Sequence, residues 1–500
     1  MNVLYIIKYF TSNWAGIGEN ETAFGTGRPD AAYTTSFECK ENFVRYRRLL
    51  FTGLIVCALA CRVVAQSAPG QLPGTAMPKI ESVPAGAEAS PNFNADAATE
   101  AYLALIPPAA KAKSDAYFEG GYWMVLGEFI YGLVVMLLLL NLRWSPGMRN
   151  LAERITRFQP LQTLIYWLQY LFLTTILLFP LTLYEDYFRE HKYGLATQTF
   201  GPWMGDQLKG FAVNLVLGGI ALMILFATVR RMTRTWWIWG AVVSWLLSIV
   251  AVLIAPVFII PIFNTPKLLE SPHITQPILA MARANGIPVH DVFEIDASKQ
   301  STRMSANVSG FGRTMRITLN DNLLRRGSPE EIQAVMGHEM GHYALNHIYN
   351  WIIFLLIVIV CFFAFLRWGV EWSLARWGGK WQVRGIGDTA VVPLVVLLAS
   401  IFFFVLTPVM NTFIRTQEHE ADMYGLNASR QPDGFAQAAI HLGEYRKMSP
   451  GTLEEWVFYD HPSGRRRIHD AMVWKGENLK LVSGDGVGYG PAVATNPPPH

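Results

Sequence analysis

Six long apolar runs restrict the folds that are open to this 500-residue chain. An α-helix rises about 1.5 Å per residue, so about 20 apolar residues cross the roughly 30 Å of bilayer hydrocarbon, and each run is long enough to do so. Hydrophobic residues make up 51% of the chain and charged residues only 16%, which is too apolar for an ordinary soluble enzyme of this size. The sequence therefore predicts a mainly α-helical, polytopic transmembrane bundle. The runs occupy residues 122–142, 161–183, 211–229, 236–262, 349–368 and 391–413.

A shorter apolar run lies near the N-terminus. Residues 45–65 begin with arginines and end with small residues, which is the layout of a signal peptide, but an uncleaved first membrane helix fits them equally well. Six and seven spans are therefore both open. Because a signal peptide belongs at an N-terminus, one hypothesis is that translation starts near Val44 and that residues 1–44 are an extension of uncertain character. Residues 66–120, rich in Ala, Pro, Gly and Ser, predict a flexible linker, and residues 481–500 predict a disordered tail.

Charge and cysteine content exclude two kinds of site. The 41 Lys and Arg residues nearly balance the 38 Asp and Glu residues, so the chain has no cationic excess for nucleic acid. The four cysteines are scattered, three of them in apolar runs, and form neither a disulfide framework nor a cysteine zinc site. Any bound metal must therefore be held by histidine and carboxylate.

The stretch from His338 to His342 has the zinc-binding pattern His-Glu-x-x-His. Residues at i and i+4 of a helix stand one above the other, so His338 and His342 can offer two imidazoles to one ion, with Glu339 beside it as a general base. Residues 328–331 supply an N-cap serine, a proline at the first helical position and a capping-box glutamate. The start of the zinc helix is thus signalled independently of the motif.

A catalytic zinc site keeps three protein ligands and an open position, so a third ligand is required. The apolar runs 349–368 and 391–413 form a predicted hairpin, which returns the chain to the membrane face that it left. Glu418, His419 and Glu420 follow immediately. Geometry alone does not choose among these three candidates.

Two polar regions surround that hairpin and are expected to form the catalytic domain. The first contains predicted strands at 291–296, 303–310 and 314–319, the last two as an antiparallel pair around residues 311–313. The second is predicted to be mainly helical. The expected order is a four-helix membrane bundle (121–263), the first catalytic part (264–348), the membrane hairpin (349–413) and the second catalytic part (414–480).

The His338–His342 motif followed by Glu418-x-x-Ala421-Asp422 resembles the membrane-embedded zinc metallopeptidases that include the type I CAAX prenyl endopeptidases and the heat-shock-induced membrane proteases. The segments 184–199 and 255–264 are similar to parts of the prenyl endopeptidases, and His461-Pro462-Ser463 with Arg467 is similar to their C-terminal motif. The resemblance extends over roughly residues 120 to 475.

The resemblance implies a small α+β zinc peptidase domain of the gluzincin type joined to the membrane bundle, with one Zn²⁺ per chain. It makes Glu418 the third zinc ligand, Glu339 the base and Asp422 a carboxylate that orients a ligand histidine. His461 and Arg467 would then hydrogen-bond the oxyanion or the substrate carbonyl, or else belong only to a basic, solvated helix.

Two further positions depart from known patterns. The family usually has Asn-Ala in the strand that binds an extended peptide, and this chain has Ser305-Ala306, so we expect substrate binding there to rest on the backbone. His347 lies five residues after His342, whereas the third histidine of a metzincin lies six after. We interpret His347 as a polar helix end.

These observations predict an integral membrane zinc metalloendopeptidase that acts on membrane-associated or lipidated peptides or proteins. One alternative is a membrane quality-control protease of broad specificity, and another is a non-catalytic, zinc-stabilised membrane scaffold. The expected partners are a peptide or protein substrate and the lipid bilayer, with no nucleic acid.

The orientation of the site rests on conflicting signals. The arginine-rich loops 143–159, 230–235 and 367–388 all fall on one side, which the positive-inside rule makes cytoplasmic. The catalytic regions then face outward, to the periplasm if this is a bacterial inner-membrane protein, and a signal peptide agrees with that. The resemblance implies a cytosolic site instead. We favour the exported face because two sequence signals concur.

Overall fold

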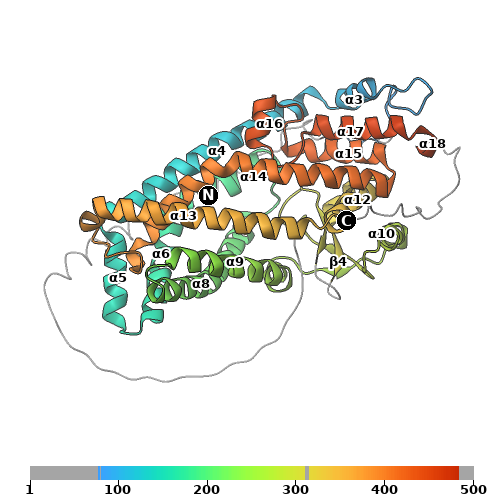
Figure 1. Cartoon of the computed structure of the whole chain (residues 1–500). Coiled ribbons are helices and arrows are strands. Elements are labelled where there is room, and N and C mark those ends of the chain that lie inside the picture. The colour runs from blue at the N-terminus through green and yellow to red at the C-terminus, as the bar shows by residue number, and fades with distance from the viewer. Residues whose placement is uncertain (1–76, 79, 81, 310–314, 483–500) are drawn as a thin grey trace.

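The structure is a computed structural model that describes residues 77, 78, 80, 82–309 and 315–482 (Figure 1). The extension 1–44, the signal peptide or first helix at 45–65 and all but two residues of the tail 481–500 lie outside the described residues. The turn predicted around residues 311–313 also lies outside them.

Six helices within the described ranges are long and apolar enough to cross a membrane, which confirms the predicted helical bundle. They pack side by side into one elongated body (Figure 1). Their outward faces carry large exposed apolar side chains such as Ile130, Val216 and Ile353, which suit contact with lipid chains and not with water. The six are α4 (Pro108–Asn141), α6 (Gln159–Thr182), α8 (Phe200–Arg231), α9 (Trp236–Ile254), α13 (His347–Trp381) and α14 (Val392–Ser429).

The last two of these helices extend far beyond the predicted spans. With 35 and 38 residues, α13 and α14 are each more than about 50 Å long, well over the thickness of the hydrocarbon. The two helices are antiparallel neighbours, and the rings of Phe354 and Phe413 stack at 3.8 Å where they approach the polar domain. Because α14 continues unbroken to Ser429, one rigid element carries both a membrane span and the region that holds Glu418.

Polar contacts close the bundle at the end far from that domain. Here α5 (Trp144–Ile155) packs on α6, and Arg149 forms an ion pair with Asp388. Arg384 pairs with Glu153 at 2.6 Å, and Arg230 donates to the carbonyl of Gly387 at 2.9 Å. The three arginine-rich loops therefore meet at one end of the molecule.

A small mixed sheet lies in the polar domain. Its strands are β1 (Lys267–Leu268), β2 (Val292–Ile295), β3 (Ala306–Ser309) and β4 (Arg316–Asn320), in the spatial order β1-β2-β4-β3. β2 and β4 are parallel, and the β3–β4 pair is antiparallel, as the sequence predicted. Three helices belong to the same region: α10 (Pro272–Ala284), α11 (Asp321–Arg326) and α12 (Pro329–Ala344).

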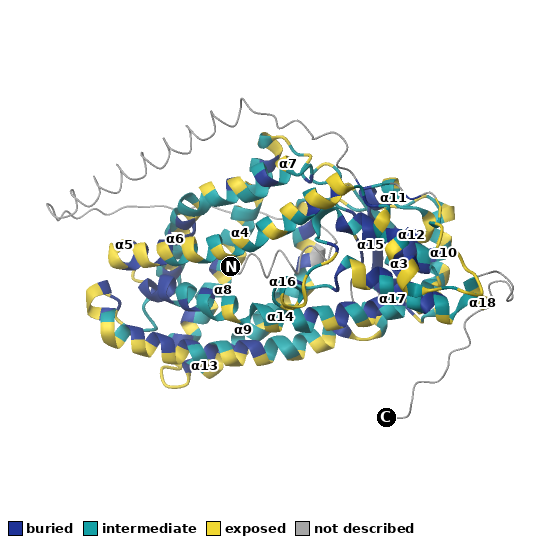
Figure 2. Ribbon diagram, turned by 90° about the horizontal axis from the view of Figure 1, so that it is seen from above, coloured by how far each residue is buried: buried dark blue, intermediate teal, exposed yellow. Residues whose placement is uncertain are grey.

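The second polar region is helical, as expected, and completes the domain around α12. Figure 2 shows buried residues gathered around α12 and α15, while the membrane helices are mottled with exposed positions. Its helices are α15 (Pro432–Leu442), α16 (Thr452–Phe458), α17 (Gly464–Glu477) and α18 (Leu479–Val482). Short helical segments elsewhere are η1 (Leu183–Arg189), α7 (Glu190–Lys192), η2 (Ala255–Ile259), η3 (Ile260–Ile262), η5 (Thr389–Val391) and η6 (Gly443–Tyr445).

Residues 66–120 were expected to form a flexible linker, but the structure is mostly helical from Ala95 onward. The segment contains α3 (Ala95–Ala104) and the beginning of α4, and α3 packs against α17. Ala98 and Tyr102 are fully buried there, and the Tyr102 hydroxyl donates to Asp433 at 2.8 Å. Few large apolar residues mark this helix, so its composition resembles that of a linker although its small residues pack in a core.

Candidate metal centre

The predicted zinc helix is α12, and its start is confirmed. The Ser328 hydroxyl accepts a hydrogen bond from the backbone N–H of Glu331 at 3.2 Å, and Pro329 occupies the first helical position. The cap fixes where the first turn begins and hence which face carries His338 and His342. That face is turned toward α14.

Glycines bring α12 and α14 unusually close together. A Cβ atom on Gly425 would lie 2.6 Å from the backbone nitrogen of His338, and one on Gly337 would lie 2.8 Å from the carbonyl oxygen of Gly425. One on Gly341 would meet the Cα of Ala421 at 3.1 Å. Only small residues permit this crossing. Because the two backbones are so close, histidine side chains on α12 can reach a glutamate side chain on α14.

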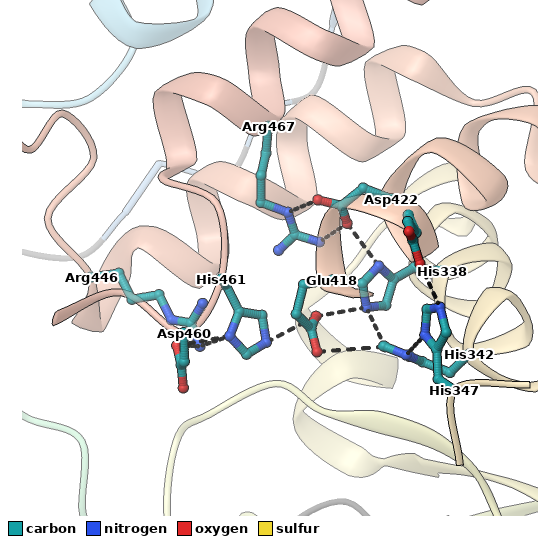
Figure 3. A network of polar contacts seen from close by, with 10 residues as sticks. His338, His342, His347, Glu418, Asp422, Arg446, Asp460, His461 and Arg467 are labelled. Atoms are coloured by element: carbon teal, nitrogen blue, oxygen red, sulfur yellow. Dashed lines mark hydrogen bonds and ion pairs between the residues drawn. The ribbon is translucent and has the colours of Figure 1, made fainter. Parts of the chain in front are cut away.

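Three potential ligand atoms converge at this crossing (Figure 3). Nε2 of His338 lies 3.2 Å from Nε2 of His342 and 3.2 Å from Oε2 of Glu418, and Nε2 of His342 lies 3.6 Å from Oε1 of Glu418. Ligands about 2.1 Å from a tetrahedral Zn²⁺ lie about 3.4 Å apart. The two nitrogens and the carboxylate thus have both the chemistry and the spacing of a zinc site with three protein ligands.

The other two candidates for the third ligand point elsewhere. His419 faces Asp470 on α17, with Nδ1 and Oδ2 3.4 Å apart, and Glu420 lies 3.2 Å from Nε2 of His347. Among the three consecutive candidates, only Glu418 lies with His338 and His342.

Asp422 lies one turn beyond Glu418 and accepts a hydrogen bond from Nδ1 of His338 at 2.7 Å. Since a carboxylate only accepts, this contact places the proton on Nδ1 and leaves Nε2 free for a metal. Arg467 was expected to hydrogen-bond the oxyanion or the substrate carbonyl, and the structure places it beside Asp422, to which it donates from both Nε and Nη2. Two of its guanidinium nitrogens are therefore engaged with Asp422.

His461 approaches the ligands from the loop before α17. Its Nε2 lies 3.1 Å from Oε2 of Glu418, and its Nδ1 donates to Asp460 at 2.8 Å. Arg446 lies against the same pair, 3.2 Å from Nδ1 of His461. The sequence analysis did not single out Asp460 or Arg446, although Asp460 directly precedes the His-Pro motif.

The environment changes the acidity of three groups on α12. Against the effect of burial, hydrogen bonds to Asp422 and Glu418 raise the pKa of His338 to about 10, so a metal ion would bind there in competition with a proton. Burial raises the pKa of Glu339 to about 7, so the carboxyl is suited to exchanging a proton near neutrality. Burial lowers the pKa of His342 to about 3, which keeps the ring neutral as a metal ligand must be.

His347 was interpreted as a polar helix end, and the structure places it in the site instead. It is 2% exposed, and its Nδ1 lies 2.8 Å from Nδ1 of His342. The five-residue spacing from His342 to His347 argues against a metzincin-type third zinc ligand, but it does not predict whether the two rings touch.

Ser305 and Ala306 lie at the start of the outer strand β3. The backbone of Ser305 is already paired, because its N–H donates to the Asn320 side chain at 3.1 Å and its carbonyl accepts from the Asn320 N–H at 2.9 Å. Hydrogen-bonded and non-hydrogen-bonded pairs alternate along an antiparallel ladder, so the backbone groups of Ala306 point away from β4. Of the two residues, Ala306 has the backbone groups that an added strand could use.

Comparison with known proteins agrees with this arrangement. Residues 94–265 match the family model described as CAAX prenyl protease N-terminal, five membrane helices, and residues 269–475 match peptidase family M48. The two matches adjoin and take in both the membrane bundle and the metal centre. The chain belongs to the membrane-embedded metallopeptidases of this family, as the sequence motifs suggested.

Three relatives illustrate the range of similarity. The uncharacterized metalloprotease YhfN of Bacillus subtilis is 27% identical over 65% of this chain and 77% of its own length. CAAX prenyl protease 1 of Saccharomyces cerevisiae is 29% identical over 59% of this chain and 69% of its own. The crystal structure of S. mikatae Ste24p superposes with a TM-score of 0.62 at 25% identity, covering 72% of this chain and 88% of that one.

Proposed function

We propose that the protein is an integral membrane zinc metalloendopeptidase that hydrolyses peptide bonds in membrane-associated or lipidated peptides or proteins. The observation that carries the proposal is the convergence of His338, His342 and Glu418 at the ligand spacing of tetrahedral zinc, beside the half-buried Glu339 of α12.

A zinc ion held by His338, His342 and Glu418 would supply Lewis acidity for the attack of water on a peptide carbonyl. Glu339 takes the proton of the attacking water and delivers it to the leaving amine. Against the effect of burial, the carboxylates of Glu418 and Asp460 raise the pKa of His461. Its doubly protonated ring donates from Nδ1 to Asp460 and from Nε2 to the oxyanion that develops on the carbonyl. Asp422 orients His338, and Arg467 holds Asp422 in place.

Substrate binding follows from the sheet and the membrane. An extended peptide added to the outer edge of β3 would pair with the backbone of Ala306, while Ser305 contributes no backbone bond because Asn320 occupies it. A cavity of about 510 Å³ lies between α13 and α14, on the side of α14 that carries Glu420 and faces away from Glu418. Phe354, Phe413 and Trp456 give it an apolar lining suited to a lipid group or a large apolar side chain. The names of the CAAX prenyl protease relatives support a lipidated substrate.

A broad quality-control protease would use the same chemistry, and the names of the CAAX prenyl protease relatives favour the lipidated class over it. A scaffold with structural zinc has no use for a base such as Glu339 next to an open coordination position.

We further propose that the protein lies in a bacterial inner membrane with the metal centre on the exported face. The grouping of Arg149, Arg230 and Arg384 at the far end of the bundle supports this orientation through the positive-inside rule. A reporter fused at the C-terminus tests it: we expect activity from a periplasmic reporter, and activity from a cytoplasmic reporter alone would reverse the orientation.

The deciding experiment for the activity compares the purified protein with Glu339→Gln. We expect both to retain one zinc per chain by metal analysis, and we expect only the native protein to cleave peptides. Equal turnover would remove Glu339 from the mechanism, and a native protein without zinc would remove the metal centre.

A further inference from the structure

The buried histidine at the start of α13 has no role in the mechanism described above. His347 follows Asn346, whose backbone is left-handed with φ 56°, and this turn folds the first residue of α13 back toward the end of α12. The ring is 2% exposed although α13 is otherwise strongly apolar. Burying a polar ring is costly unless its nitrogens are hydrogen-bonded, so its partners indicate its purpose.

Both nitrogens of His347 have partners. Nδ1 lies 2.8 Å from Nδ1 of His342, and Nε2 lies 3.2 Å from Oε2 of Glu420. Figure 3 shows His342 between His347 and Glu418, so the contact to His347 is made by the ring nitrogen that does not face the other ligands.

The directions of these hydrogen bonds follow from the chemistry of each group. When Nε2 of His342 binds a metal, its proton resides on Nδ1, which must donate. Nδ1 of His347 is therefore the acceptor, its proton resides on Nε2, and Nε2 donates to the Glu420 carboxylate, which can only accept. One tautomer of each ring satisfies the whole chain of contacts.

We propose that His347 and Glu420 are positioning residues for zinc, acting through His342: Glu420 fixes the tautomer of His347, and His347 accepts the proton of His342 and holds its Nε2 on the metal. The proposal rests on the proposed function only for the identity of the metal.

The two ligand histidines are then held in different ways. His338 donates directly to the buried carboxylate of Asp422, whereas His342 reaches a carboxylate only through a second imidazole. Glu420 is also about half exposed, with a side-chain exposure of 53% against 2% for Asp422. Residues outside the ligand set are commonly needed for zinc affinity, and here they lie at the start of a membrane helix.

Zinc affinity, measured by competition with a chromogenic chelator on the detergent-solubilised full chain, tests the proposal without reference to proteolysis. His347→Leu removes the acceptor, and we expect a loss in affinity of about 10- to 100-fold. His347→Asn can place an amide oxygen near the position of Nδ1, so we expect it to recover part of that loss. Glu420→Ala, at a half-exposed position that does not threaten folding, should lower affinity by a smaller factor.

His441→Asn is the matched control. Nδ1 of His441, on α15, donates to Glu331 of α12 at 2.8 Å, and the ring is 5% exposed, so this is a second buried histidine–carboxylate pair, about two turns of α12 before His338. We expect this variant to melt at a lower temperature while keeping native zinc affinity.

Cobalt substitution gives a second readout, because the visible absorption of bound Co²⁺ reports ligand geometry. We expect the spectrum to change in His347→Leu and not in His441→Asn. Native affinity in both His347 variants, or equal losses in Leu and Asn, would overturn the role of His347. Native affinity in Glu420→Ala would overturn the link to Glu420, even if the His347 variants failed to fold. All of these outcomes leave the proposed peptidase standing, provided that the native protein binds zinc.

Discussion

Arg467 donates two hydrogen bonds to Asp422, from Nε at 2.9 Å and from Nη2 at 2.5 Å. The pair is nearly dry, with side-chain exposures of 10% and 2%. Asp422 also accepts a hydrogen bond from Nδ1 of His338, so Arg467 helps to hold the carboxylate that orients this histidine. The planar guanidinium group of arginine can donate two parallel hydrogen bonds to one carboxylate, and the ammonium group of lysine cannot.

Replacing Arg467 should therefore destabilise the domain and weaken zinc binding together. Arg467→Gln leaves a buried carboxylate without its cation, and we expect a loss of about 3–5 kcal/mol in the free energy of unfolding. Arg467→Lys should recover only part of it. Arg465→Ala, which breaks an exposed ion pair with Glu100, is the control and should change stability by about 0.5 kcal/mol or less. Thermal melting with zinc titration measures both effects, and native behaviour of Arg467→Gln would contradict them.

The close crossing of α12 and α14 gives a prediction about Gly425. A methyl group there would lie 2.6 Å from the backbone nitrogen of His338, and backbone cannot yield as a flexible side chain can. We expect Gly425→Ala to cost about 1–3 kcal/mol by overpacking and to lower zinc affinity by separating Glu418 from the histidines.

Gly210→Ala is the matched control for Gly425→Ala. Gly210 lies within α8, and a Cβ atom there meets no atom within 4 Å. Alanine should be neutral or stabilising by about 1 kcal/mol at that position, because glycine is a poor helix former. If both variants behaved alike, the close crossing would not be what aligns the ligands.

His461 is expected to act on the transition state. Removing one donor to an oxyanion lowers kcat by about 10²- to 10³-fold in other hydrolases, so we expect a loss of that size in His461→Ala with zinc retained. His469→Ala, a half-exposed histidine on α17, should have native kinetics. Steady-state kinetics with metal analysis makes the comparison, and a rise in KM with unchanged kcat would assign His461 to substrate binding instead.

The sequence predicts the membrane helices and α12 well because the signals are local. A bilayer demands about 20 apolar residues per helix, and a capped helix with histidines at i and i+4 carries its own geometry. α3 was missed because Ala98 and Tyr102 bury it without an apolar run, and residue spacing cannot show that α17 lies against it.

The choice of Glu418 over its neighbours depended on resemblance, although a local signal was available. Glu418 and Asp422 are one turn apart on a single helix face, while Glu420 points about 160° away from that face by helical geometry. His347 could not be placed in this way, since its direction depends on the left-handed turn at Asn346. The contact between Arg467 and Asp422 could not be predicted, because the sequence does not reveal that Asp422 lies between Arg467 and His338.

The acidity of Glu339 predicts the pH dependence of turnover. Burial raises its pKa to about 7, and the positive charge of bound zinc lowers it, so the midpoint of the acid limb should lie at or below about pH 7. Only the carboxylate form can accept the proton of the attacking water. We therefore expect kcat/KM to fall as the pH decreases through that midpoint, approaching about tenfold per pH unit.

Loss of zinc at low pH would also lower kcat/KM. The pKa of His342 helps to separate this cause from protonation of Glu339. Because burial lowers the pKa of His342 to about 3, that ring stays neutral where Glu339 titrates, so protonation of His342 should not release the metal there. Protonation of His338, whose pKa the carboxylates of Asp422 and Glu418 raise to about 10 against the effect of burial, does compete with the metal, so zinc is supplied in excess. Zinc content measured at each pH of the kinetic profile should then stay at one per chain while activity falls. If zinc loss and activity loss occurred together, the limb would report ligand protonation, and Glu339 would not be the titrating base.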